Sequence, residues 1–197
     1  YNSGLTHNKR DCLSVLRNLK VPTAKHFSIN KGTKINEDLI QSTVGLPCFV
    51  KANRAGSSFG VYKVTAKKDL TTFIEKAFEE DSQVIIESAL EGREVSVGVA
   101  AFNGDITVLP ITEIITENEF FDYAAKYEGK AQEITPAKIP DKWKELVEHW
   151  AKSIYISLDL KGVVRSEFIF VNGIPHLLEV NTVPGITRKS IIPKQVE

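Results

Sequence analysis

Hydrophobic residues recur at helical spacing in several segments of the chain. After Asn8, a residue type that caps helices, Leu13 and Leu16 lie on one helix face. The predicted helices cover residues 8–19, 37–44, 67–80 and 140–158. The last is the longest, and its apolar stripe comprises Trp143, Leu146, Val147, Trp150, Ile154 and Leu158.

Short apolar runs and alternating patterns predict strands between these helices. The expected strands cover residues 26–29, 47–52, 83–87, 94–102, 105–115, 163–171 and 174–181. Asn103-Gly104 and Asn172-Gly173 are hairpin signals between consecutive strands. Helices that alternate with largely antiparallel strands indicate an α+β fold. We expect two lobes, residues 1–90 and 91–197, with a long functional loop over residues 116–136.

Composition narrows the class of protein. The 197 residues carry 25 basic and 25 acidic side chains, which argues against a dedicated nucleic-acid binder. No apolar run is long enough to span a membrane, and no signal-peptide pattern opens the chain. Cys12 and Cys48 lack metal-type spacing, so we expect two reduced thiols in a cytoplasmic protein. Because the chain begins at Tyr1 and has no methionine, we interpret it as a fragment or a processed chain.

A glycine- and serine-rich turn over residues 55–60 follows the strand that carries Lys51. Small residues leave backbone N–H groups free to surround an anion, and the lysine adds a point charge for phosphate. The turn is not a P-loop, because the Gly-Lys-Ser/Thr ending is missing. A plain flexible hairpin loop is the alternative.

Two further segments are candidates for ligand binding. In residues 87–94, acidic side chains flank a short connector after a buried strand. Such a connector can offer backbone groups to a base and a carboxylate to a ribose. The alternative is a solvated acidic turn. Residues 120–127 hold four aromatic residues and a lysine within the long loop. Such a loop is expected to fold over a ligand, or to cover a satellite hydrophobic cluster.

The last two strands carry Arg165, Glu167, Glu179 and Asn181. Two carboxylates and an amide oxygen suit Mg²⁺ or Mn²⁺ rather than zinc. The scattered histidines, His7, His26, His149 and His176, suggest ordinary roles.

Strand parity constrains this ligand set. Arg165 shares a face with Glu167, but a regular two-residue turn at Asn172-Gly173 would point Glu179 to the other face. A joint site therefore needs a three-residue connection or a bulge, and we predict one of these here.

Together these motifs resemble the ATP-grasp superfamily and, within it, the D-alanine–D-alanine ligase family. The similarity runs from Asn8 to Pro193 and is most specific at residues 56–60, 122–127 and 179–190. It implies two α+β lobes that clasp ATP, and the ligation of two D-alanine molecules through an acyl phosphate. Such a reaction serves peptidoglycan precursor synthesis, and hence cell wall and cell shape, in the cytoplasm. The family also implies a homodimer without nucleic-acid or membrane partners.

The resemblance assigns nucleotide binding to Lys9, Lys51, Ser57, Ser58, Glu87, Leu90, Glu94 and Lys126. Lys9 and Lys51 match lysines that contact phosphates. Glu87 and Leu90 match the adenine connector, and Glu94 matches the ribose-binding carboxylate.

The same resemblance assigns catalysis to Arg165, Ser57, Lys126, Tyr127, Gly185 and Ser190, and two Mg²⁺ or Mn²⁺ ions to Glu167, Glu179 and Asn181. Arg165 matches an arginine that stabilises the reacting centre. Lys126 and Tyr127 match a mobile loop that closes the site. Gly185 and Ser190 match residues that hold the carboxylate of the second amino acid.

The chain departs from the family pattern at three positions, where Asn8, Phe121 and Glu167 replace the more frequent Asp, Tyr and Asp. Members also carry an N-terminal domain of roughly a hundred residues, a typical domain size, and a C-terminal helix, which we do not find here. We therefore expect a weakly active or inactive fragment. Alternative functions are a D-alanine–D-lactate ligase, another ATP-grasp carboxylate–amine ligase, or an inactive nucleotide-binding module.

Overall fold

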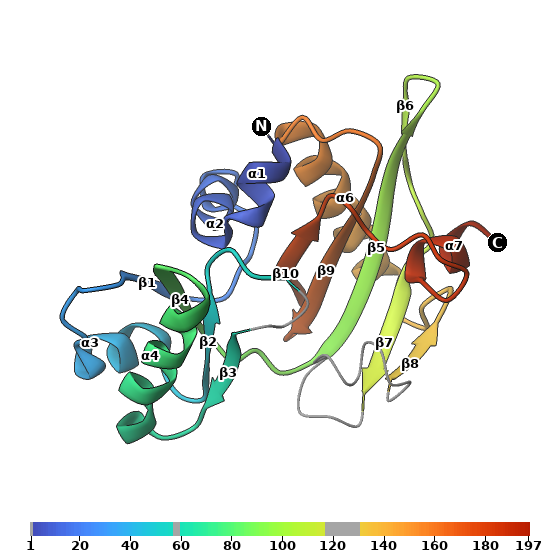
Figure 1. The fold of residues 1–197 in the computed structure, drawn as a ribbon. Coiled ribbons are helices and arrows are strands. Elements are labelled where there is room, and N and C mark those ends of the chain that lie inside the picture. The colour runs from blue at the N-terminus through green and yellow to red at the C-terminus, as the bar shows by residue number, and fades with distance from the viewer. Residues whose placement is uncertain (1, 57–59, 117–130) are drawn as a thin grey trace. The chain divides into compact units, whose positions relative to one another are not determined.

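A computed structural model of the chain describes residues 2–56, 60–116 and 131–197. They form two packing units, each an antiparallel sheet with helices packed against it (Figure 1). The four-stranded unit contains the described parts of His7–Ser14 and Ala24–Leu90. The six-stranded unit contains the described parts of Tyr1–Thr6, Val15–Thr23 and Glu91–Glu197. This architecture confirms the predicted α+β class.

The four-stranded unit has the strand order β1-β4-β2-β3. Its strands are β1 (His26–Asn30), β2 (Cys48–Ala52), β3 (Val61–Val64) and β4 (Gln83–Ser88). Its helical elements are α3 (Glu37–Val44), the 3₁₀ helix η1 (Lys67–Asp69) and α4 (Leu70–Glu80). Asn36 caps α3 by accepting a hydrogen bond from Leu39 N at 3.0 Å, and Gly45, with φ of 75°, ends it.

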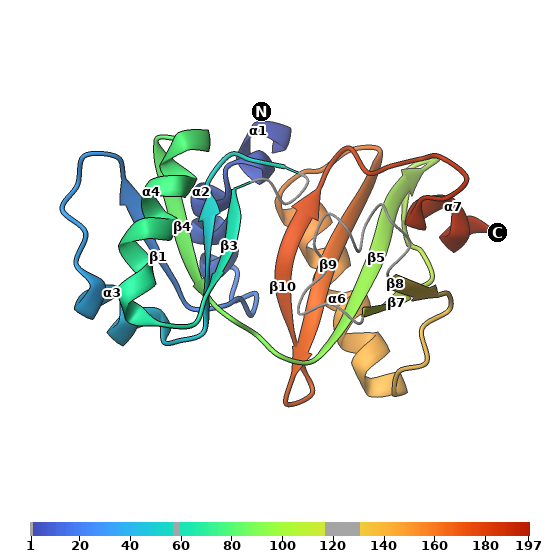
Figure 2. The same ribbon diagram turned by 60° about the horizontal axis from the view of Figure 1, so that its bottom comes forward.

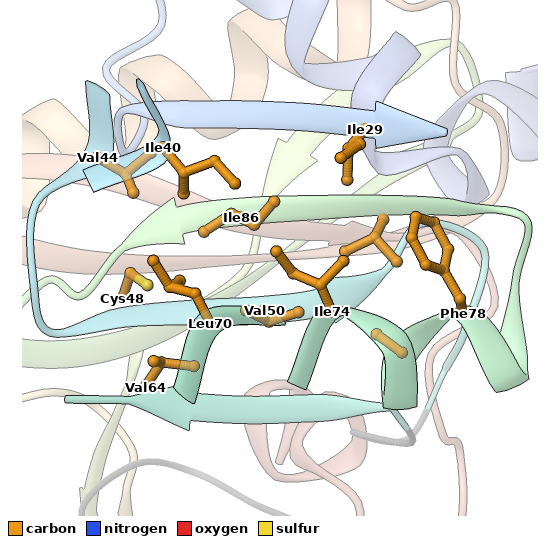
Figure 3. Packing of buried hydrophobic residues seen from close by; sticks show 12 residues of the cluster. Ile29, Ile40, Val44, Cys48, Val50, Val64, Leu70, Ile74, Phe78 and Ile86 are labelled. Carbon is orange, nitrogen blue, oxygen red and sulfur yellow. The ribbon is translucent and has the colours of Figure 1, made fainter. Parts of the chain in front are cut away.

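The core of this unit lies between the helices and one face of the sheet (Figure 3). Alternation along β2 and β4 points Val50 and Ile86 into it, and both are fully buried. Helical spacing on α4 adds Ile74 and Phe78. The opposite face of the sheet carries Lys51 and Glu87 together with the apolar residues Phe49 and Ile85.

The six-stranded unit has the strand order β10-β9-β5-β7-β8, with β6 also paired to β5. Its strands are β5 (Arg93–Phe102), β6 (Asp105–Val108), β7 (Thr112–Thr116), β8 (Ala131–Ile134), β9 (Val163–Val171) and β10 (Ile174–Asn181). Helix α6 (Asp141–Ser157) covers one face (Figure 1). Trp143 of this helix stacks on Phe170 with ring centroids 4.3 Å apart. Helix α7 (Ile191–Val196) contacts β5.

Two N-terminal pieces pack differently from the predicted lobes of residues 1–90 and 91–197. Helices α1 (Asn2–His7) and α2 (Lys9–Asn18) contribute residues to both units. The segment after α2 joins β10, because Leu177 N donates to Pro22 O at 2.8 Å and Thr23 bridges Leu177. Along the chain, the four-stranded unit ends at Leu90 and the last segment of the six-stranded unit begins at Glu91.

Most predicted elements form, and the exceptions have local causes. The predicted strand over residues 105–115 is divided into β6 and β7, because Pro110 has no N–H for the ladder. Part of the predicted long loop, residues 131–134, pairs with β7 as β8. Helices α1 and α7 were not predicted. Each has only six residues, too few for a clear periodicity.

Two of the composition-based expectations can be compared with the structure. Cys12 and Cys48 are free, as expected for reduced thiols, and both are buried, which raises the pKa of each thiol to about 11. Among the described residues, we find no helix with the length and apolar character needed to cross a membrane.

The core of the four-stranded unit provides a stability test. We expect Ile74→Ala to cost about 2–5 kcal/mol, because it leaves a cavity between α4 and the sheet. Leu39→Ala is the matched control, since Leu39 on α3 is 49% exposed. Urea unfolding with hydrogen exchange at the β4 amides measures both. Equal effects of the two substitutions would contradict this assignment of the core.

Candidate functional site

Four charged or polar side chains predicted to act together lie on one face of the β9–β10 hairpin. Glu179 is paired with Glu167, and Asn181 with Arg165, as direct cross-strand partners. Arg165 Nη2 lies 2.7 Å from Glu167 Oε1, and these side chains are only 13% and 4% exposed. Asn181 Oδ1 accepts a hydrogen bond from Val183 N at 3.0 Å.

One inserted residue makes this arrangement possible. The turn itself is a two-residue hairpin, with Val171 paired to Ile174 and positive φ at Asn172 and Gly173 (Figure 2). The predicted three-residue connection is therefore wrong. The predicted alternative, a bulge, is confirmed further along β10, where the register shifts between Leu177 and Glu179. The extra residue moves Glu179 from a position opposite Ser166 to one opposite Glu167.

The donor set suits a small divalent cation. Like charges in directly opposed strand positions repel each other, and a cation between them relieves this repulsion. Among the described residues, no group of three or more His, Cys, Asp or Glu side chains gathers. Two carboxylates with one amide oxygen match the pattern of Mg²⁺, which keeps several water or phosphate ligands.

The same sheet face extends onto β5. Ser96 is opposite Glu167, and Glu94 is two residues away on the same strand face. Ser96 is fully buried, and its Oγ has no hydrogen-bond partner within the parts of the chain that the structure describes. Sequence patterns did not single out Ser96, because a serine within a strand is unremarkable until its neighbours are known.

Gly185 and Ser190 come together in the loop before α7. A Cβ on Gly185 would lie 2.7 Å from Ser190 Oγ, closer than real contacts allow. Ser190 N donates to Thr187 O at 2.8 Å, and the Thr187 and Ser190 hydroxyl oxygens are 2.9 Å apart. The loop thus presents a fixed hydroxyl beside a position that must stay free of a side chain.

In the four-stranded unit, Lys51 lies on the face opposite the core. Its ammonium donates to the carboxylate of Glu87 on the neighbouring strand, and the two side chains are 19% and 10% exposed. Lys51 Nζ is also 5.8 Å from the centre of the Phe49 ring. This pairs a predicted phosphate ligand with a predicted residue of the adenine connector.

Lys9 at the start of α2 reaches the glycine- and serine-rich turn. Its Nζ donates to Ala55 O at 2.6 Å. Asn53, which is fully buried, holds the helix start by accepting from Arg10 N at 2.8 Å and donating to Asn8 Oδ1 at 2.8 Å. Asn53 was missed in the sequence, where its position directly after a strand suggested only a turn.

Arg54 at the same turn forms a bidentate ion pair. Its Nη2 and Nε donate to Asp81 carboxylate oxygens at 2.6 and 3.0 Å, and its backbone N donates at 2.8 Å. These bonds lower the pKa of Asp81 from 3.8 to about 2. The pair fixes the entry to the turn.

Two of the other predicted site residues, Leu90 and Glu94, are described by the structure. Leu90 belongs to the four-stranded unit with Glu87, whereas Glu94 belongs to the six-stranded unit. Ser57, Ser58, Lys126 and Tyr127 lie outside the described residues, as does Phe121.

Comparisons with known proteins agree on one family. A family model described as "D-ala D-ala ligase C-terminus" matches residues 15–197. The D-alanine--D-alanine ligase of Flavobacterium johnsoniae is 55% identical over 197 residues, which are 100% of this chain and 61% of that protein.

Two solved structures have the same fold. The D-alanine--D-alanine ligase of Bacillus anthracis complexed with ATP has a TM-score of 0.83 at 30% identity, over 99% of this chain and 61% of that one. The VanG D-Ala:D-Ser ligase of Enterococcus faecalis has a TM-score of 0.84 at 31% identity, over 98% of this chain and 57% of that one. The chain thus spans about 60% of the length of the curated relatives it matches.

The Arg54–Asp81 pair predicts a specific acid response. Because folding lowers the pKa of Asp81, the pair stabilises the fold above the usual value of 3.8, and this stabilisation is lost as pH falls toward about 2. Asp81→Asn should lower the melting temperature near neutral pH and flatten its decline across that acid range. Asp105→Asn, at an exposed hairpin position, is the control. Parallel melting curves for Asp81→Asn and the unchanged chain would contradict the assignment.

Proposed function

The chain belongs to the D-alanine–D-alanine ligase family, in the part that its C-terminal family model describes, and on that premise we propose that it binds ATP and joins two D-alanine molecules as part of a ligase. The observation that carries the proposal is the opposed pair of Glu167 and Glu179 beside Arg165 and Asn181. A sheet that concentrates acidic oxygens next to an arginine suits phosphoryl transfer, which needs positioning and charge stabilisation.

The proposed reaction has two steps. A carboxylate oxygen of the first D-alanine attacks the γ-phosphorus of ATP, which gives an acyl phosphate and ADP. The amine of the second D-alanine then attacks the acyl carbon, loses a proton, and inorganic phosphate leaves. Arg165, held by Glu167 at 2.7 Å, provides a fixed positive charge for the oxygens that gain charge in both steps.

Magnesium or manganese would be held by Glu167, Glu179 and Asn181, whose oxygens fit such an ion. When bound, the metal supplies positive charge that neutralises the phosphate oxygens. The bulge before Glu179 supports this assignment, because it orients both carboxylates to one face.

We propose that the nucleotide contacts the face of the four-stranded sheet that carries Lys51 and Glu87. Lys9 and Lys51 are the phosphate ligands in this scheme, with Ser57 and Ser58 from the turn. Lys51 must exchange part of its contact with Glu87 for phosphate oxygens, since the pair now neutralises its charge. Glu87 and Leu90 are assigned to the adenine, and Glu94 to the ribose.

The second amino acid is assigned to the loop before α7. Ser190 Oγ can donate to its carboxylate, and the missing side chain at Gly185 leaves room for that group. Lys126 and Tyr127 are proposed to close the site and keep water from the acyl phosphate. In the whole protein the reaction would supply peptidoglycan precursors in the cytoplasm, and the enzyme would be a homodimer.

A second candidate function is a ligase that uses another acceptor. The similarity to VanG, named a D-Ala:D-Ser ligase, favours D-serine as one such acceptor. D-lactate is the other acceptor to consider. Tyr127 argues against D-lactate, since D-lactate-using relatives carry histidine at the matching position. An inactive nucleotide-binding fragment is the remaining alternative, because the chain covers only about 60% of the length of its relatives.

The metal assignment can be tested on this chain. Excess ATP with Mg²⁺ should raise the melting temperature. At a ligand concentration a hundred times Kd, the free energy of unfolding should increase by about 2.7 kcal/mol. Glu179→Gln should raise the Kd for ATP with Mg²⁺ by about tenfold, which reduces the stabilisation by about 1.4 kcal/mol. Glu145→Gln on the exposed side of α6 is the matched control. A Glu179→Gln increment equal to that of the control would remove the metal from this site.

Acceptor choice is tested by phosphate release with ATP, Mg²⁺ and each candidate acid. This chain alone should bind nucleotide yet turn over slowly. A version extended to the length of its relatives should prefer D-alanine to D-lactate and D-serine near neutral pH. A preference for D-lactate or D-serine would refute the assignment of D-alanine as acceptor. Rapid D-alanine ligation by the chain alone would refute the expectation of slow turnover.

A further inference from the structure

Strand β5 has a gap along one of its edges. It pairs with β9 from Arg93 to Ala100, but its other edge meets β7 only up to Ser96 and β6 only from Val99. Leu109 N donates to Gly98 O at 2.8 Å, and Pro110, which has no N–H, follows directly. The N–H of Gly98 is thus left without a strand partner on this edge of the described chain, directly after the last β7 pair at Ser96.

The side-chain amide of Gln195 fills this gap. Its Oε1 accepts from Gly98 N at 3.0 Å, and its Nε2 donates to Ser96 O at 2.9 Å. A third bond joins Nε2 to Thr112 Oγ1 at 3.0 Å, and Thr112 Oγ1 is 2.7 Å from Thr135 Oγ1. Gln195 is 3% exposed, so its amide replaces a peptide group inside a buried ladder.

These bonds hold α7 unusually close to the sheet. A Cβ on Gly98 would lie 2.8 Å from Gln195 Oε1 and from Ile192 Cδ1 and 2.7 Å from Leu109 Cδ1, so any larger residue would displace the ends of these side chains. Ile191 and Ile192, in the first turn of α7, are both buried. Lys194 adds an ion pair with Glu133 at 2.7 Å. Gln195 supplies the directional part of this attachment, because hydrogen bonds fix orientation and apolar contacts do not.

The orientation of α7 determines where Ser190 lies. Ser190 is the residue directly before the helix, and its hydroxyl packs against Gly185. With its backbone N bonded to Thr187 O, Ser190 has little freedom apart from that of the helix. A shift of α7 on β5 would therefore move the Ser190 hydroxyl by a similar distance.

We propose that Gln195 is a positioning residue that sets the Ser190–Gly185 site for the carboxylate of the acceptor amino acid. The inference that this ligand is an acceptor carboxylate rests on the proposed function. The attachment of the loop through Gln195 does not. Gln195 acts by filling the ladder gap on β5, without touching the substrate itself.

The first test measures attachment in this chain. Gln195→Met keeps the side-chain length but removes the amide. We expect amide hydrogen exchange at Gly98 and over residues 186–192 to quicken by about tenfold or more, since three buried hydrogen bonds are lost. Exchange in β4 should stay unchanged, and Gln41→Met, on an exposed part of α3, is the matched control. Unchanged exchange over residues 186–192 would overturn the proposal.

A second variant covers the case that Gln195→Met does not fold. Thr112→Val keeps the side-chain shape but removes one partner of Gln195, so exchange over residues 186–192 should quicken in the same direction and by less. No change in exchange with this variant would likewise overturn the proposal.

The second test separates positioning from general loss of structure. In the version extended to the length of its relatives, Gln195→Met should raise KM for D-alanine by about tenfold and leave KM for ATP within about twofold, because only the acceptor site moves. Equal changes in both constants would overturn the positioning role. Two results could also occur together: faster exchange in Gln195→Met, and no D-alanine-dependent phosphate release by the unsubstituted protein. They would uphold the attachment through Gln195 and overturn the assignment of the acceptor. That outcome is thus distinguishable from a failure of the attachment itself.

Discussion

The alternation of side chains along β9 and β10 is the constraint on which the acidic face depends. In a regular strand Leu178 and Glu179 would face opposite sides, and the tight turn at Asn172-Gly173 would fix which side each faces. A single irregular residue reverses that parity between Leu177 and Glu179. Everything proposed about charge on this face follows from that local defect in an otherwise regular ladder.

Much of the fold could be predicted because its elements have strong local signals. Helix α3 and strands β9 and β10 have the predicted bounds, since apolar periodicity and flanking turns determine them locally. The need for a bulge was also deducible from parity. Its position was not, because a bulge appears only once two strands are paired, and nothing in the residues around Leu178 marks it.

The polar residues that the sequence did not reveal have a common setting. Asn53 and Gln195 are both buried amides placed where a regular sheet contact stops. Asn53 holds the start of α2 after β2, and Gln195 bridges the interval between β6 and β7. An amide suits such places because it carries a donor and an acceptor together, like the peptide group it replaces. In sequence both look like ordinary surface residues, since their partners are distant along the chain.

The close approach of α7 to β5 also restricts how this chain can diverge. Any side chain at position 98 would occupy the space now held by the amide of Gln195 and the methyl group of Ile192. Changes at positions 98, 192 and 195 are therefore interdependent, because their side chains share one space. Relatives that carry a larger residue in place of Gly98 should show an accompanying change at position 109, 192 or 195, so these positions should vary together through the family's history.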